Sequence, residues 1–162
     1  MILNKWMKRH TLTLYAPMEG DIIPLEKVTD PVFSEKMMGD GIAILPTNGT
    51  VVAPADGTVI QIAPTKHAIG IRTEDGAEIL IHVGLDTVEL SGSPFDVHVN
   101  VGDPITTGQA LLTADLAQIH QSGKDMVTPM IITNGSALKH SYAFHAGGPS
   151  LPGKTVVAQA EQ

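Results

Sequence analysis

The chain of 162 residues contains no cysteine. Disulfide bonds, thiolate nucleophiles and cysteine-based zinc or iron–sulfur sites are therefore excluded by composition. Aromatic residues make up only 4% of the sequence, whereas valine, isoleucine, alanine, glycine and threonine are frequent. Because a core of small and β-branched side chains suits pleated sheets, the composition favours an all-β fold.

Positive charge is also scarce, since 10 Lys and Arg stand against 17 Asp and Glu and the formal net charge is −7. Proteins that bind a phosphate backbone present basic stripes, so nucleic acid is not an expected partner. No apolar run reaches the roughly 18 residues that a membrane-spanning helix needs. The N-terminus lacks the apolar stretch of an export signal, and we expect a soluble, cytoplasmic protein.

Short runs rich in Val, Ile and Leu alternate with Gly, Pro, Asn and Asp, at a spacing typical of a β-sandwich or barrel. The predicted strands cover residues 12–15, 21–25, 42–45, 50–53, 58–63, 68–73, 78–83, 110–115, 127–133 and 155–158. Helix is expected only as one or two short turns at 33–38 and 115–120, with Ser34 and Asp115 as candidate caps. We expect a flexible segment over 1–11 and a single domain over 12–162.

One corner motif occurs twice. Residues 16–23 and 53–60 both read as Ala-Pro, two residues, Gly and then a strand. Proline presets φ and glycine supplies the positive φ of a tight turn, so each copy predicts a strand corner. A third corner at 101–109 uses the same residue types. The pattern predicts a duplicated β motif folded into a sandwich.

The segment 65–90 contains two alternating runs joined by Asp75-Gly76, a strong signal for a β-hairpin. His67 lies in the first run and His82 in the second. A loop of two or four residues would place both on one face, and a loop of three would separate them. A neutral imidazole keeps a lone pair that can attack phosphorus, and a second imidazole can donate to the transferred oxygens. The Gly84 carbonyl is a candidate acceptor to hold the nucleophile's tautomer.

The hairpin, together with residues 31–44, 52–57 and 128–134, resembles the glucose-class enzyme IIA component of the bacterial phosphotransferase system. The resemblance implies a phosphocarrier that accepts a phosphoryl group on His82 from the histidine-containing phosphocarrier HPr. It implies transfer from there to a cysteine of a cognate IIB domain. It also implies that His67 stabilises the phosphoryl group and that Thr65 hydrogen-bonds within the histidine pair. No cofactor is expected, although the pair could bind an adventitious Zn²⁺ ion.

By the same resemblance, both partners dock on a shallow apolar depression around the histidines. The matching rim positions are Val32, Phe33, Met37, Met38, Ala63, Leu80 and Val88, with Asp30 and Asp86 as acidic edge groups. Ala63 and Leu80 stand where other members can carry aromatics, and the soft methionines compensate by packing against more than one partner. Asp30 and Asp86 are equally turn formers. Residues 1–9 form a short basic amphipathic stretch that could contact a membrane surface.

Two other classes of protein share parts of this pattern. A lysostaphin-like zinc endopeptidase has a similar duplicated sandwich but needs three protein ligands, and the expected His-x-His is missing. A biotinyl or lipoyl carrier domain needs a modifiable lysine at a hairpin tip, where this chain has Glu74-Asp75-Gly76. The transported sugar cannot be read from the sequence, because a IIA component does not touch it.

Overall fold

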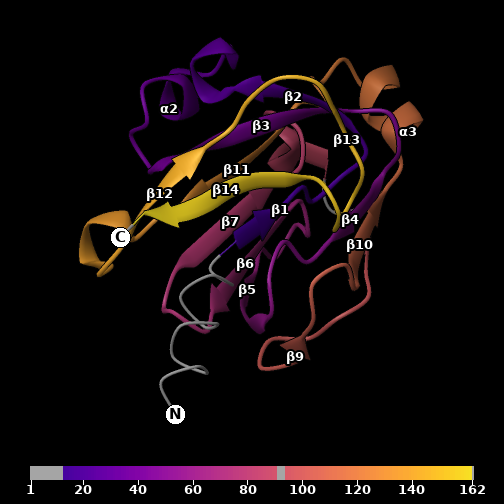
Figure 1. Cartoon of the computed structure of the whole chain (residues 1–162). Coiled ribbons are helices and arrows are strands. Elements are labelled where there is room, and N and C mark those ends of the chain that lie inside the picture. Colours follow the sequence, from indigo (N-terminus) through magenta and orange to yellow (C-terminus); the bar gives the residue numbers. More distant parts are fainter. Residues whose placement is uncertain (1–12, 91–93, 162) are drawn as a thin grey trace.

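The computed structural model describes residues 13–90 and 94–161. Its strands pair antiparallel and form one eight-stranded sheet and two three-stranded sheets (Figure 1). The predicted all-β class is therefore confirmed. The predicted flexible segment 1–11, with its basic stretch, lies outside the described residues.

The eight-stranded sheet has the strand order β13-β2-β3-β11-β7-β6-β5-β9. Its strands are β13 (Pro149–Ser150), β2 (Gly20–Pro24), β3 (Asp40–Pro46), β11 (Thr128–Ile132), β7 (Glu78–His82), β6 (Ala68–Thr73), β5 (Gly57–Ile62) and β9 (Pro104–Ile105). The smaller sheets contain β1 (Thr13–Tyr15), β14 (Val156–Glu161) and β12 (Ser141–Phe144), and β4 (Thr50–Val52), β10 (Ala110–Ala114) and β8 (Phe95–Val97). The helical turns are η1 (Leu25–Lys27), α2 (Pro31–Ser34), η2 (Thr87–Leu90), α3 (Leu116–Gln121) and η3 (Gly135–Ala137).

All ten predicted strands are present, and their ends differ from the prediction by three residues at most. Sequence patterns missed β8, β9, β12 and β13, which are two to four residues long. Such short segments carry too few residues for an alternating pattern, and pairing with a longer neighbour creates them. Helix α3 follows its predicted cap, Asp115, whose carboxylate accepts a hydrogen bond from the helix.

Helix α2 is placed differently from the prediction of 33–38. It begins at Pro31, and the cap is Asp30, whose carboxylate accepts a hydrogen bond from the Val32 N–H at 3.0 Å. Proline suits the first helical position because no donor is required there. Ser34, the predicted cap, is instead the last helical residue. The local turn chemistry of Asp-Pro therefore decided the helix start.

The duplicated corners pair with each other across the molecule. The Tyr15 N–H donates to the Pro54 carbonyl at 2.9 Å, and the Val52 N–H donates to the Pro17 carbonyl at 2.8 Å. These two hydrogen bonds are equivalent, because each joins the residue before one Ala-Pro to the proline of the other copy. The predicted duplication is thus visible as an approximate two-fold relation.

The large sheet follows the same two-fold relation. Gly20 pairs with Pro46 in one half as Gly57 pairs with Thr73 in the other. By the same correspondence, Ile42 of β3 is equivalent to Ile69 of β6. Their partners on the next strands, Met130 and Ile81, are therefore equivalent, and these two residues also pair with each other at the centre of the sheet. The correspondence also makes Ile131 of β11 the counterpart of His82 of β7.

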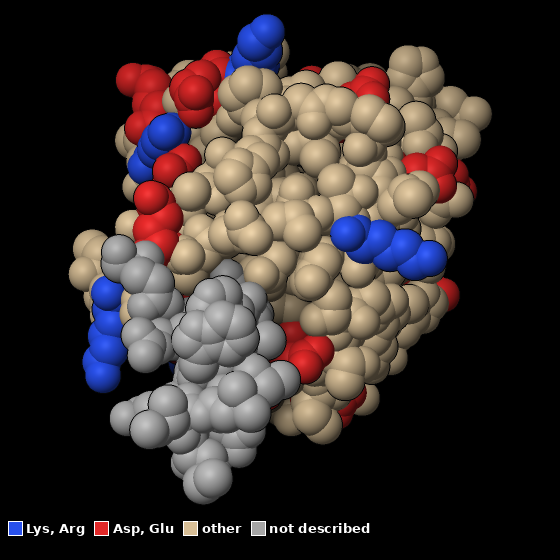
Figure 2. All heavy atoms as spheres, in the orientation of Figure 1, with Lys and Arg blue, Asp and Glu red and all other residues tan. Residues whose placement is uncertain are grey.

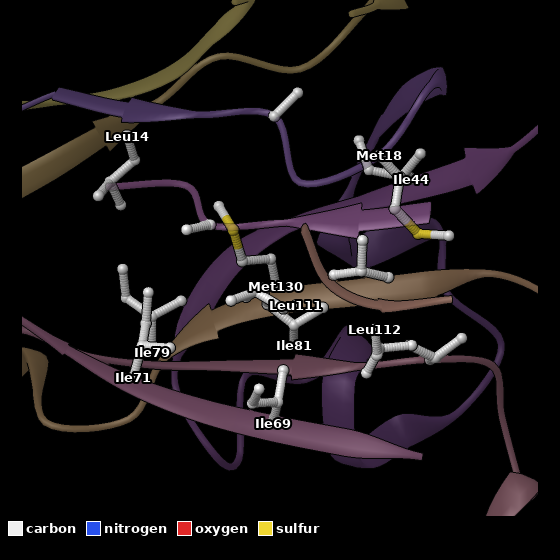
Figure 3. Close-up of a cluster of buried hydrophobic side chains, with 14 of the residues drawn as sticks. Leu14, Met18, Ile44, Ile69, Ile71, Ile79, Ile81, Leu111, Leu112 and Met130 are labelled. Atoms are coloured by element: carbon white, nitrogen blue, oxygen red, sulfur yellow. The ribbon is translucent and has the colours of Figure 1, made fainter. Parts of the chain in front are cut away.

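The main core lies between the large sheet and the two small sheets. Figure 3 shows Leu14 of one layer facing Ile71 and Ile79 of the other, and Ile69, Ile81, Leu111 and Leu112 belong to the same cluster. All seven are at most 1% exposed. This packing of small and β-branched side chains agrees with the low aromatic content.

A second core covers part of the other face of the large sheet. It joins residues of η1 and α2 to Ala43 and Ile131 of the sheet, and its buried members are Leu25, Val28, Phe33, Ala43, Leu85, Val127 and Ile131. Ile23 and Leu80 pack against it. The candidate histidines lie at the border of this second core.

On the face shown in Figure 2, most of the visible surface is uncharged and the charged side chains lie mainly near its edges. Among the described residues visible there, Lys and Arg form no continuous stripe. The face therefore lacks the basic footprint that a nucleic-acid binder presents.

Candidate active site

Strand alternation places His82 on the face of the sheet away from the main core. Ile79 and Ile81 are at most 1% exposed in the main core, whereas Leu80 packs against the second core. His82, two residues after Leu80, shares its face. The His82 ring lies 5.2 Å from the Phe33 ring of α2, measured between centroids. The end of β7 therefore delivers an imidazole to the edge of the second core.

The two candidate histidines are in direct contact. The centroids of the His67 and His82 rings are 4.7 Å apart, and the ring planes meet at 79°. The predicted pairing of the histidines is confirmed.

The route to this pairing differs from the prediction. The Thr73 N–H donates to the Ala77 carbonyl, so the hairpin loop has three residues, and Ala68 lies opposite His82. This register was expected to separate the histidines. His67 nevertheless precedes β6 and follows Lys66, whose φ is +63°. His67 thus lies at the end of the ladder, next to a turn, where regular strand alternation stops being a reliable guide to the direction of its side chain.

A backbone carbonyl selects the tautomer of His82. The Nδ1 atom of His82 lies 2.8 Å from the Gly84 carbonyl oxygen, as anticipated. Because a carbonyl only accepts, Nδ1 carries the proton and Nε2 keeps the lone pair. Burial lowers the pKa of His82, while the Gly84 hydrogen bond and the carboxylates of Asp30 and Asp86 partly offset this. At pH 7 the ring is neutral with a free Nε2.

His67 is more strongly shifted towards the neutral form. The residue is only 8% exposed, and its Nδ1 lies 2.7 Å from the Thr65 hydroxyl. Burial, with repulsion from His82, lowers the pKa of His67 to about 4. The structure thus brings all three predicted residues, His67, His82 and Thr65, into one cluster.

Comparison with known proteins shows which family the chain resembles as a whole. Residues 12–138 match the model of the phosphoenolpyruvate-dependent sugar phosphotransferase system EIIA 1 family. The chain belongs to this family. It is 49% identical over 151 residues to the PTS system glucose-specific EIICBA component of Streptococcus pneumoniae. The alignment covers 93% of this chain and 20% of that relative, so the chain spans about a fifth of its length.

A solved structure gives the same result. Glucose permease IIA from Mycoplasma capricolum is 38% identical and superposes with a TM-score of 0.80, covering 91% of this chain and 94% of that one. The resemblance to glucose-class EIIA proteins is therefore confirmed, together with their β-sandwich fold.

The apolar rim expected of an EIIA protein is largely exposed. Val32, Met37, Met38 and Val88 are 36%, 71%, 42% and 51% exposed, and Ala63 and Leu80 are half-buried. The assignment of Phe33 to the exposed rim was wrong, because its side chain is 4% exposed and belongs to the second core. The Phe33 ring instead lies beside the His82 ring.

The acidic edge groups have structural tasks within this fold. Asp30 caps α2, and Asp86 occupies a turn with a φ of +58°. Their reading as turn formers is confirmed. Both carboxylates also raise the pKa of His82, so they lie near enough to act on the ring. Their docking role stays a prediction.

The alternative classes receive no support. In the described part of the chain, no group of three or more His, Cys, Asp or Glu could hold a metal ion, as a zinc endopeptidase requires. The β6–β7 loop carries no lysine that a biotinyl or lipoyl carrier would need.

No helix among the described residues is long and apolar enough to span a membrane.

Sequence reasoning did not single out Thr87. Its side chain is fully buried, and its hydroxyl donates to the Val83 carbonyl at 2.5 Å. The available signal was its position four residues after Val83, a spacing at which threonine often bonds back to the backbone. The Thr87 hydroxyl is therefore bonded to the turn that follows His82.

Proposed function

We propose that this chain is a histidine phosphocarrier that accepts a phosphoryl group from HPr on Nε2 of His82. It then donates the group to the cysteine of a cognate IIB domain. The hydrogen bond from Nδ1 of His82 to the Gly84 carbonyl carries the proposal, because it leaves a lone pair on Nε2 beside a second neutral histidine.

The acceptance step is an in-line displacement at phosphorus. The Nε2 lone pair of His82 forms the new N–P bond while the N–P bond to the HPr histidine breaks, and the HPr imidazole keeps that electron pair. The proton on Nδ1 of His82 does not move during this step. In the second step the IIB thiolate attacks phosphorus, and Nε2 recovers its lone pair.

His67 acts as a donor to the phosphoryl oxygens. When the Thr65 hydroxyl donates to Nδ1 of His67, the proton of the neutral ring sits on Nε2. Preorganised donors aimed at developing charge are the main means by which a protein accelerates phosphoryl transfer. The dianionic phosphoryl group also favours a protonated His67, because an opposite charge nearby raises the pKa of histidine.

The exposed rim is the proposed docking surface for both partners. Met37 and Met38 are flexible and polarizable, which suits a surface that must fit two different proteins in turn. Asp30 and Asp86 at its edge would pair with basic partner residues. One relative carries the letters CBA in its name and the other is named a glucose permease. The IIB domain of a glucose permease is therefore the first acceptor to test, in the cytoplasm.

The test is intact-mass measurement after incubation with phosphoenolpyruvate, enzyme I and HPr. The wild-type chain is expected to gain one acid-labile phosphate, and His82→Ala is expected to gain none. The matched control is His98→Ala, because His98 also bonds a threonine hydroxyl, at 2.8 Å from Thr113. Labelling of His82→Ala, or loss of labelling in His98→Ala, would contradict the assignment.

A further inference from the structure

The turn after His82 runs through Val83, Gly84 and Leu85, and hydrogen bonds hold both peptide groups that join these three residues. The Val83 carbonyl accepts the Thr87 hydroxyl at 2.5 Å, and the Leu85 N–H donates to the Asp125 carbonyl at 3.0 Å. Between them lies Gly84, whose carbonyl oxygen is the acceptor for Nδ1 of His82. The Gly84 carbonyl and the Leu85 N–H belong to one planar peptide group, so the Asp125 bond orients that carbonyl directly, while the Thr87 bond fixes the peptide group before it.

The space around Gly84 admits no side chain at this position of the turn. Its φ is +77°, and a Cβ added there would lie 2.5 Å from Cγ2 of Thr87 and 2.8 Å from the Asp125 carbonyl oxygen. Thr87 thus contacts the turn with its methyl group as well as with its hydroxyl.

The same turn also reaches the second histidine. The Val83 N–H donates to the His67 carbonyl at 2.8 Å. Val83 is therefore hydrogen-bonded to His67 through its N–H and to Thr87 through its carbonyl. Since the Thr87 side chain is fully buried, no water competes for its hydroxyl.

We propose that Thr87 is a positioning residue of the phosphocarrier site. Its hydroxyl fixes the turn that aims the Gly84 carbonyl at Nδ1 of His82, and this selects the tautomer whose lone pair is on Nε2. The catalytic consequence rests on the proposed phosphocarrier function, whereas the effect on the tautomer does not. If Thr87 only filled space, its substitution would change stability alone.

The test uses ring-nitrogen NMR spectra of the chain with ¹⁵N-labelled histidine, which distinguish the two neutral tautomers. Wild-type His82 is expected as the Nδ1–H form. Thr87→Val keeps the shape and removes the hydroxyl, so His82 should become a mixture of tautomers. Phosphorylation by HPr should slow about fivefold to tenfold, the usual worth of one hydrogen bond. Thr87→Ser restores the hydroxyl and should restore both properties.

The control is Thr73→Val, which removes a buried hydroxyl at the far end of the same hairpin. It should leave the His82 tautomer and the transfer rate unchanged. If Thr87→Val does not fold, Thr87→Ala carries the same expectation. An unchanged Nδ1–H tautomer and unchanged rate in the folded Thr87 variant would overturn the proposal. A wild-type chain that takes no phosphate, with the tautomer shift still present in Thr87→Val, would overturn the proposed function and leave the positioning role standing.

Discussion

The two halves of the large sheet repeat one arrangement of strands but connect those strands differently. In the first half, β2 leads to β3 through residues 25–39, which form η1 and α2. In the second half, β5 leads to β6 through only residues 63–67, a turn closed by the bond from the Ala63 N–H to the Ala68 carbonyl. The long connection covers the sheet, and the short one supplies Thr65 and His67.

This difference separates two equivalent positions on the sheet. Ile131 is 1% exposed in the second core with Phe33, while its counterpart His82 stays partly open at the border of that core. The two halves therefore share one arrangement of strands, and their unequal connections make them different: the long one buries Ile131, and the short one brings His67 to His82. The following substitutions test the long and short connections in turn.

Loss of Phe33 should have the largest effect, because it removes the aromatic centre of the long connection. Phe33→Ala is expected to lower the free energy of unfolding by about 3–5 kcal/mol, the usual cost of truncating a buried phenylalanine. Phe33→Glu should be at least as damaging, since it would bury a carboxylate. Chemical denaturation measures both. The neighbouring Val32→Ala, at an exposed position, should cost less than about 0.5 kcal/mol, and similar values for the two alanine variants would refute the covering role.

Loss of His67 tests the short connection. His67→Ala should still accept phosphate on His82, but onward transfer to IIB should slow about 100-fold to 1000-fold, because one preorganised donor is removed. His67→Gln keeps an amide donor and should also transfer poorly, since the amide cannot become positively charged. Acid-labile labelling followed by a chase with IIB separates the two steps. If His67→Ala cannot be labelled at all, the assigned division of labour is wrong.

The exposed end of the long connection should matter for docking alone. Met38→Glu places a charge that must lose water when a partner binds, so the KM for HPr should rise about tenfold, or about 1.4 kcal/mol. Its unfolding free energy should stay within about 0.5 kcal/mol of wild type. Val101→Glu is the control, because Val101 is 60% exposed on the loop before β9. An equal rise in KM for the control would show a general charge effect.

The smallest expected effect is the pH dependence of stability. His67 has a pKa of about 4 in the folded chain and about 6.5 in the unfolded chain. The folded state therefore binds fewer protons, and this residue makes stability fall as pH drops from 6.5 towards 4, with no further loss below that. Thermal unfolding of wild type and His67→Gln should diverge across this range. A difference that does not change with pH would contradict the buried, neutral state of His67.

Local patterns predicted the scaffold well because they depend on neighbouring residues. Alternating runs marked the long strands, the Ala-Pro corners marked the duplication, and the Asp115 cap marked α3. The same kind of local reasoning favours Asp30-Pro31 as the start of α2, so the prediction of Ser34 as the cap was an error of pattern reading. The short strand β13 was not predictable, since two residues carry no period.

The amino-acid sequence by itself determined the all-β class, the two histidines, and the residues in which the chain resembles the EIIA family. Tertiary structure decided how these residues meet. The three-residue hairpin loop predicts that His67 and His82 lie on opposite faces, yet they are in contact, with His67 placed just before β6 and after the positive-φ residue Lys66. Likewise, Phe33 is buried because η1 and α2 fold back onto the sheet, and the tautomer of His82 depends on a turn held by Asp125, which is distant in the chain. Such contacts join residues that no local pattern relates, so only the folded chain specifies them.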